Sequence, residues 1–144
     1  MKKAISFVFA MAIGFCVFAQ KPAKPVNLKP QIKFESDTFD YGSLKESEPA
    51  VHFFTFKNTG NAPLIIVKVD KSCGCTTPQW PTEPIKPGAT GKIRVEYDTK
   101  GRIGDFTKAV FVYTNVPGPP IILIIKGTVE MPPQPEQKIE IPQH

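Results

Sequence analysis

The chain has 144 residues, 41% hydrophobic and 22% charged, which is enough for one domain with a buried core. Its formal net charge is +5, and no basic cluster is larger than a pair. Charge this small and scattered argues against a nucleic-acid-binding protein. With only two histidines, the chain also offers little material for a catalytic triad.

Residues 1–19 have the pattern of a secretory signal peptide. A short basic start precedes an apolar run over residues 4–15, and small residues stand before the expected cleavage point after Ala19. The run is too short for a lasting membrane helix. A lipid anchor on Cys16 is disfavoured because the large Phe15 precedes it. We therefore expect an exported protein, periplasmic or extracellular, with no transmembrane helix after cleavage.

The mature chain divides by composition into three parts. Residues 20–31 are rich in Pro and Lys, and residues 131–144 in Pro, Gln and Glu, with no apolar periodicity in either. We expect the first segment to be a linker, the last a disordered tail, and residues 32–130 the single folded domain.

Segment 32–130 alternates short apolar runs with turn-forming residues at intervals of about ten residues, and it contains no helical repeat. About seven strands are expected, and the stretches that carry them are 32–42 (one interrupted strand), 51–57, 63–71, 91–98, 106–114 and 121–130. Val69 falls out of the alternation in its strand, which indicates a bulge. Lys100 to Arg102 predicts a hairpin turn, and Gly127 a bend or a close backbone approach. The pattern predicts an all-β, immunoglobulin-like Greek-key β-sandwich.

Cys73 and Cys75 flank Gly74 and are the only cysteines left after signal cleavage. An oxidising compartment favours a disulfide between them, and Gly74 lets the backbone bend to close it. The ring would be small and easily reduced. The pair can instead be two packed thiols on one face of a strand, a monovalent copper site, or a bridge between chains. These alternatives stay open, and no cofactor is predicted.

Several motifs together resemble a known bacterial family. The motifs that carry the resemblance are Asn58-Thr59-Gly60-Asn61, Ser72-Cys73-Gly74-Cys75-Thr76, Ile85-Lys86-Pro87-Gly88 and Ile125-Lys126-Gly127. In this order and spacing they resemble the domain of unknown function 1573, DUF1573, over about residues 39–129. The resemblance implies an exported immunoglobulin-like domain akin to modules of ciliary and centrosomal proteins, with an architecture related to that of major sperm protein. It implies no reaction.

His52 is the one candidate for a catalytic base within the expected sandwich, and its apolar neighbours Val51, Phe53 and Phe54 indicate a histidine packed on a strand instead. We therefore expect no enzyme. Trp80, the single tryptophan, is a candidate anchor for a partner, with a plug over the end of the sandwich as the alternative.

Alternation in the last two expected strands predicts an apolar outer face. If Val110 and Val112 face the core, the residues between and after them point outward, and the same holds in the final strand. The outward residues are Phe111, Tyr113, Ile122 and Ile124. Such a cluster needs covering by the linker or tail, a second copy or a protein partner.

We therefore expect a non-catalytic binding or assembly module of the cell envelope. Its candidate contact residues are Trp80, Phe111, Tyr113, Ile122 and Ile124, and its partner is another envelope protein or a second copy. The alternative is a thiol-redox or copper-binding protein that uses Cys73 and Cys75.

Overall fold

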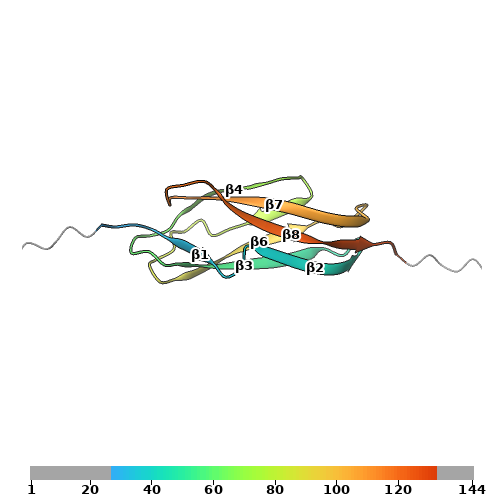
Figure 1. Cartoon of the computed structure of the whole chain (residues 1–144), viewed down its shortest axis with the longest axis horizontal. Coiled ribbons are helices and arrows are strands. Elements are labelled where there is room, and N and C mark those ends of the chain that lie inside the picture. Colours follow the sequence, from blue (N-terminus) through green and yellow to red (C-terminus); the bar gives the residue numbers. More distant parts are fainter. Residues whose placement is uncertain (1–26, 133–144) are drawn as a thin grey trace, which may run out of the picture.

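The computed structural model describes residues 27–132, and all its regular elements are β-strands. They are β1 (Ile32–Phe34), β2 (Thr38–Lys45), β3 (Ala50–Asn58), β4 (Ile66–Lys71), β5 (Thr76–Gln79), β6 (Thr90–Tyr97), β7 (Gly104–Thr114) and β8 (Ile121–Glu130). Two four-stranded sheets, β1-β3-β6-β5 and β2-β8-β7-β4, pack face to face (Figure 1). The expected all-β immunoglobulin-like sandwich is confirmed.

The expected signal peptide, together with most of the linker and tail, lies outside the described residues, and these assignments stay predictions. None of the described residues forms a helix that is long and apolar enough to cross a membrane.

The core lies between the sheets and follows the alternation of the strands. Ile93, Val95 and Tyr97 of β6 are buried, as are Leu123 and Ile125 of β8. Gly127 continues the inward series of β8, but a Cβ there would lie 2.9 Å from the carbonyl oxygen of Gly42 and 3.1 Å from the Phe106 ring. The close approach expected at Gly127 is therefore confirmed.

The first expected strand is two strands in different sheets. β1 pairs antiparallel with β3, whereas β2 pairs parallel with β8. Between them the Ser36 hydroxyl donates to the Thr38 carbonyl oxygen at 2.7 Å and accepts from the Thr38 N–H at 3.3 Å, which stabilises a local turn. This crossover and the additional strand β5 account for the eight strands of the structure, one more than the roughly seven expected.

Two other local expectations need correction, and one is confirmed. Between the expected strands 63–71 and 91–98, residues 78–87 are rich in Pro and no strand was expected, but β5 forms there; it tolerates Pro78 because an edge strand pairs on one side only. The hairpin at Lys100 to Arg102 is wrong, because β6 and β7 belong to different sheets and the segment crosses between them. The bulge in β4 is confirmed by a register shift between Ile66 and Lys68.

Asn58 joins two loops at one end of the sandwich. The residue is fully buried, and its Nδ2 donates to the carbonyl oxygens of Ala62 at 2.8 Å and Ile85 at 2.9 Å. Its Oδ1 accepts from the Gly60 N–H at 3.0 Å. One amide side chain thus satisfies polar backbone groups of both the β3–β4 loop and the β5–β6 loop.

Replacing Asn58 with Ala should lower the free energy of unfolding by about 2–4 kcal/mol, because buried backbone groups lose their partners. Urea denaturation monitored by Trp80 fluorescence measures the change. Asn61→Ala is the matched control in the same turn, since Asn61 bonds exposed backbone at Asn27 and Lys29. Equal losses in the two variants would contradict the role of Asn58.

Candidate functional site

Cys73 and Cys75 form a disulfide in the loop between β4 and β5, with their Cα atoms 5.3 Å apart. This separation lies within the range that an unstrained bridge needs. Of the arrangements left open by the sequence, the structure has the bridge within one chain. Neither sulfur of the bridge is a thiolate, so the oxidised pair offers copper no thiolate ligand.

One side of the bridge rests on the core. Cys75 is 8% exposed and belongs to the core cluster that also contains Tyr97 and Phe106, whose rings stack 4.0 Å apart. The fully buried Thr76 places its Oγ1 3.5 Å from Cys73 Sγ and 4.0 Å from Cys75 Sγ. Because bridged sulfurs carry no hydrogen, the Thr76 hydroxyl is the donor in this contact.

The other side of the bridge faces an open cleft of about 430 Å³. Arg102 and Lys108 line this cleft together with the bridge and the exposed Ile103. Arg102 is oriented by Asp98, whose carbonyl oxygen accepts from Nε at 2.9 Å and whose carboxylate lies 3.8 Å from the guanidinium. Two cations therefore line the same cleft as a disulfide.

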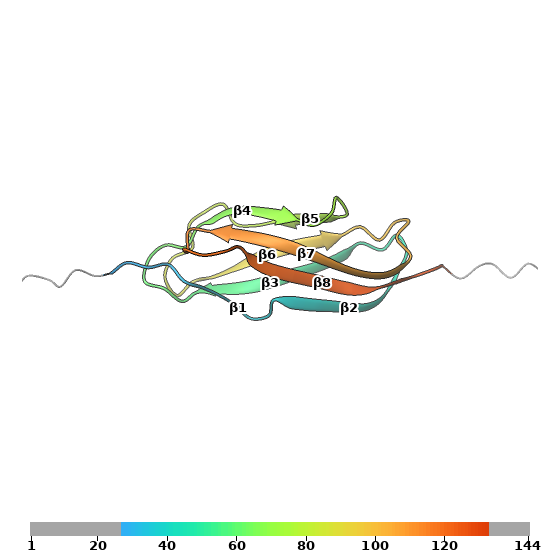
Figure 2. The same ribbon diagram turned by 45° about the horizontal axis from the view of Figure 1, so that its top comes forward.

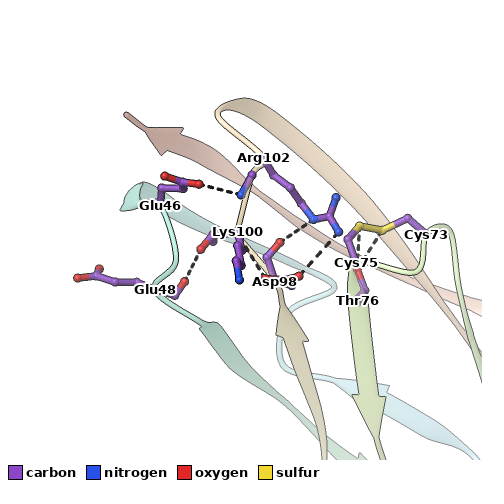
Figure 3. A network of polar contacts seen from close by, with 10 residues as sticks. Glu46, Glu48, Cys73, Cys75, Thr76, Asp98, Lys100 and Arg102 are labelled. Carbon is purple, nitrogen blue, oxygen red and sulfur yellow. Dashed lines mark hydrogen bonds and ion pairs between the residues drawn. A yellow bond between two sulfur atoms is a disulfide. The ribbon is translucent and has the colours of Figure 1, made fainter. Parts of the chain in front are cut away.

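The loop that carries Arg102 is held by the β2–β3 loop, as Figure 3 shows. Thr99 is buried and donates its hydroxyl to the Glu48 carbonyl oxygen at 2.7 Å. Gly101 donates its N–H to Glu46 Oε1 at 2.9 Å. These contacts hold the β6–β7 loop at one wall of the cleft, so the β2–β3 loop as well as Asp98 sets the position of Arg102.

His52 takes no part in this site. It points inward from β3 and stacks on Phe39 of β2 at 3.6 Å between ring centroids, with an interplanar angle of 10°. Phe54 meets the imidazole edge-on at 4.7 Å. Burial lowers the pKa of His52 below its ordinary value of 6.5, because it penalises the charged imidazole.

Four of the five predicted contact residues share one sheet face. Phe111 of β7 lies directly opposite Ile122 of β8, and both alternate with buried residues. Ile124 and Tyr113 continue the same outward series on their strands. Trp80 follows β5 in the other sheet, where it is half-buried against the core cluster. Their part in binding stays a prediction.

Within residues 27–132, no group of three or more His, Cys, Asp and Glu side chains is placed to hold a metal ion.

The family described as "Protein of unknown function (DUF1573)" matches residues 32–129. The chain belongs to the DUF1573 family. The family resemblance of its motifs is thereby confirmed. No curated protein matches the chain.

Two solved structures with a similar fold are a protein of unknown function from Porphyromonas gingivalis W83 and PapD-like domain 7 of human CEP192. The first is 20% identical with a TM-score of 0.62, covering 76% of this chain and 51% of the other. The second is 12% identical with a TM-score of 0.58, covering 86% and 99%. The DUF1573 chain thus spans about half the length of the bacterial protein. At these identities the likeness shows the fold.

A family 123 glycoside hydrolase from Clostridium perfringens contains a similar fold. It is 9% identical with a TM-score of 0.56, covering 74% of this chain and 28% of the hydrolase chain.

Sequence reasoning found the cysteines of the DUF1573 site but missed Thr76, Arg102 and Lys108. Thr76 follows Cys75 directly in the motif, so the sequence did indicate that Thr76 lies close to the cysteines. Arg102 and Lys108 come from the β6–β7 loop and from β7, and no local pattern links them to the cysteines.

Replacing both cysteines with Ala should lower the free energy of unfolding by only about 1.5 kcal/mol, the loop-closure value for a three-residue loop. Urea denaturation of the variant beside the oxidised wild type measures this. A loss above about 4 kcal/mol would make the bridge a principal stabiliser of the domain.

The stability of the domain should fall as the pH drops from about 7 to 5. A folded-state pKa below 6.5 means that the unfolded chain binds the proton more readily, so the contribution of neutral His52 is present above pH 6.5 and is lost as the pH falls through the folded pKa. The pKa of Asp40 is lowered from its ordinary value of 3.8 by the hydrogen bond from the Gly42 N–H and by Lys126. The contribution of Asp40 to stability is therefore lost only below pH 3.8, outside this range.

Denaturation at several pH values tests this with His52→Phe, which keeps the stack and cannot titrate, and with His144→Gln as the control. The decline should vanish in the first variant and persist in the second. If the free energy of unfolding falls equally with pH in His52→Phe and wild type, His52 does not cause the decline.

Proposed function

We propose that this DUF1573 protein is an exported, non-catalytic module that binds a protein partner of the cell envelope through one face of its β2-β8-β7-β4 sheet. Export is supported by the signal-peptide pattern of residues 1–19. The binding role is supported by an apolar surface on a rigid scaffold, which the following paragraphs describe.

The observation that carries the proposal is a concentration of exposed apolar side chains on this sheet, which we call the apolar face. It consists of the exposed residues Val67, Tyr113 and Ile122 together with Phe111 and Ile124, which are partly buried. Val67 is 64% exposed, Ile122 49% and Tyr113 37%. Contiguous exposed apolar residues of this kind mark interaction surfaces more often than single ones do.

Charged pairs border the apolar face on both sides. Lys68 and Asp70 of β4 form an ion pair at 2.7 Å, and the Lys68 ammonium lies 5.2 Å from the centre of the Tyr113 ring. On the β2 side, Lys126 and Asp40 pair at 3.3 Å. An apolar centre with a charged, hydrated rim is the usual anatomy of a protein–protein interface.

The outer face of the other sheet differs. Phe53 is 51% exposed there, but its cross-strand neighbour is Arg94, which pairs with Glu96. Val51, 37% exposed, lies on the same outer face, and its cross-strand neighbour is Glu96. Two exposed apolar residues, each opposite a charged one, are ordinary surface. The contrast supports a contact through the β2-β8-β7-β4 sheet.

The contact is made by the face and not by strand addition at the edge. β2 and β4 are the two edges of this sheet, and a register shift interrupts the ladder of each, between Asp40 and Ser43 in β2 and between Ile66 and Lys68 in β4. Bulges and lysines on an edge strand oppose pairing with another strand. The recurrence of the fold as 28% of a longer chain also suits a module that serves other domains.

Ile122→Glu should lower partner capture by roughly tenfold or more, since charge replaces an apolar side chain at the centre of the contact. A photo-crosslinking residue at position 122 in the native host's envelope identifies the partner, and purified wild-type domain competes for it while Ile122→Glu does not. Phe53→Glu is the matched control, because its side chain is equally exposed on the opposite sheet. Both substitutions should change the free energy of unfolding by less than about 0.5 kcal/mol.

Equal crosslinking from positions 122 and 53 would contradict the proposal. Sedimentation of the purified domain tests whether a second copy of the chain binds the apolar face. A dimer that Ile122→Glu dissociates would assign the apolar face to a second copy instead of an envelope partner.

A further inference from the structure

We infer that the Cys73–Cys75 disulfide is a reversible redox centre that accepts two electrons from a dithiol in the compartment to which the protein is exported. This activity is independent of the apolar face, which lies on the outer surface of one sheet, whereas the bridge lies in the loop that joins the two sheets.

Cys73 is the more exposed of the two bridged residues. Cys73 is partly exposed, whereas Cys75 is 8% exposed. Around Gly74 no atom lies within 4 Å of the position that a Cβ would occupy, so the outer side of the loop is open. Since exchange requires access to the sulfur that is attacked, Cys73 is the point of attack.

The surroundings of the bridge stabilise the thiolate that leaves. The buried Thr76 hydroxyl lies within 4.0 Å of both sulfurs, and they are the partners of its Oγ1 in the described structure. Arg102 and Lys108 line the adjoining cleft together with one carboxylate, that of Asp105, which accepts a hydrogen bond from the Thr128 hydroxyl. A hydroxyl donor and nearby cations both lower the free energy of a thiolate relative to the thiol, and a better leaving group departs faster.

The bridge is poorly suited to a purely stabilising role. Its cysteines are two residues apart, and a loop this short restricts the unfolded chain far less than the long loops that structural disulfides close. A disulfide that only stabilises the fold also does not need a fully buried hydroxyl directed at both of its sulfurs. Both observations fit a bond that opens and closes.

The exchange balances in two steps. The first thiolate of the partner dithiol bonds to Cys73 Sγ, the Cys73–Cys75 bond breaks, and its electron pair leaves on Cys75 Sγ. The second thiolate of the partner then attacks the partner sulfur in the mixed disulfide and releases Cys73. The two protons lost by the partner end on Cys73 and Cys75, so the partner is oxidised to a disulfide and this chain is reduced to a dithiol.

Dithiothreitol is the probe for this reaction. The native full-length mature protein, without denaturant, should be reduced completely, and reoxidation should restore the intramolecular bridge. Thr76→Val should slow the reduction about tenfold, because the thiolate that leaves on Cys75 loses a hydrogen-bond donor. Thr77→Val is the control, since the Thr77 side chain is exposed on the neighbouring position of β5.

A surface substitution provides a second variant that does not depend on the core. Lys108→Gln should slow reduction roughly threefold at low salt, with the difference disappearing at high salt as the charge is screened. Lys57→Gln, on β3 and outside the cleft, should have no effect.

The point of attack is tested by single cysteines. Cys75→Ala, which keeps Cys73, should form a mixed disulfide with oxidised glutathione about tenfold faster than Cys73→Ala does. A bridge that dithiothreitol reduces only after unfolding by denaturant would overturn the inference, as would Thr76→Val and Lys108→Gln proteins that both match wild type.

Discussion

The amide of Asn58 is the contact on which one end of the sandwich depends. It binds backbone groups of two loops that are distant in sequence, and it does so where water cannot replace it. These two loops precede β4 and β6, so their alignment sets how the sheets meet along the side formed by β4 and β5 (Figure 2). The turn-rich sequence around Asn58 is therefore a joint between sheets as well as a connection between strands.

The apolar face and the Cys73–Cys75 bridge lie in different parts of the fold. The apolar face belongs to paired strands, where Phe111 and Ile122 lie opposite each other in a regular ladder. The Cys73–Cys75 bridge belongs to a loop that crosses between sheets, and no strand pairing runs through it. Opening the bridge would leave both ladders intact, so a change of redox state need not alter the apolar face.

Sequence reasoning succeeded where alternation was strong. The strand of Ile93 and Val95 and the strand of Leu123 and Ile125 were recognisable because buried and exposed positions alternate over many residues. It failed where pairing depends on distant neighbours: Pro78 hid β5, and the turn at Gly101 gave no sign that its flanking strands lie in different sheets. For the same reason Lys108 could not be linked to the cysteines, since only the folded chain brings them to one cleft.

The parallel pairing of β2 with β8 has a mechanical consequence. The described chain begins at one end of the long axis and ends at the other (Figure 1), while β2 and β8 run side by side in the same direction. A pull between these ends would slide the two strands past each other, loading their hydrogen bonds together rather than one after another. The ion pair between Asp40 and Lys126 would resist the same motion. A pull along the long axis would thus load this strand pair in shear.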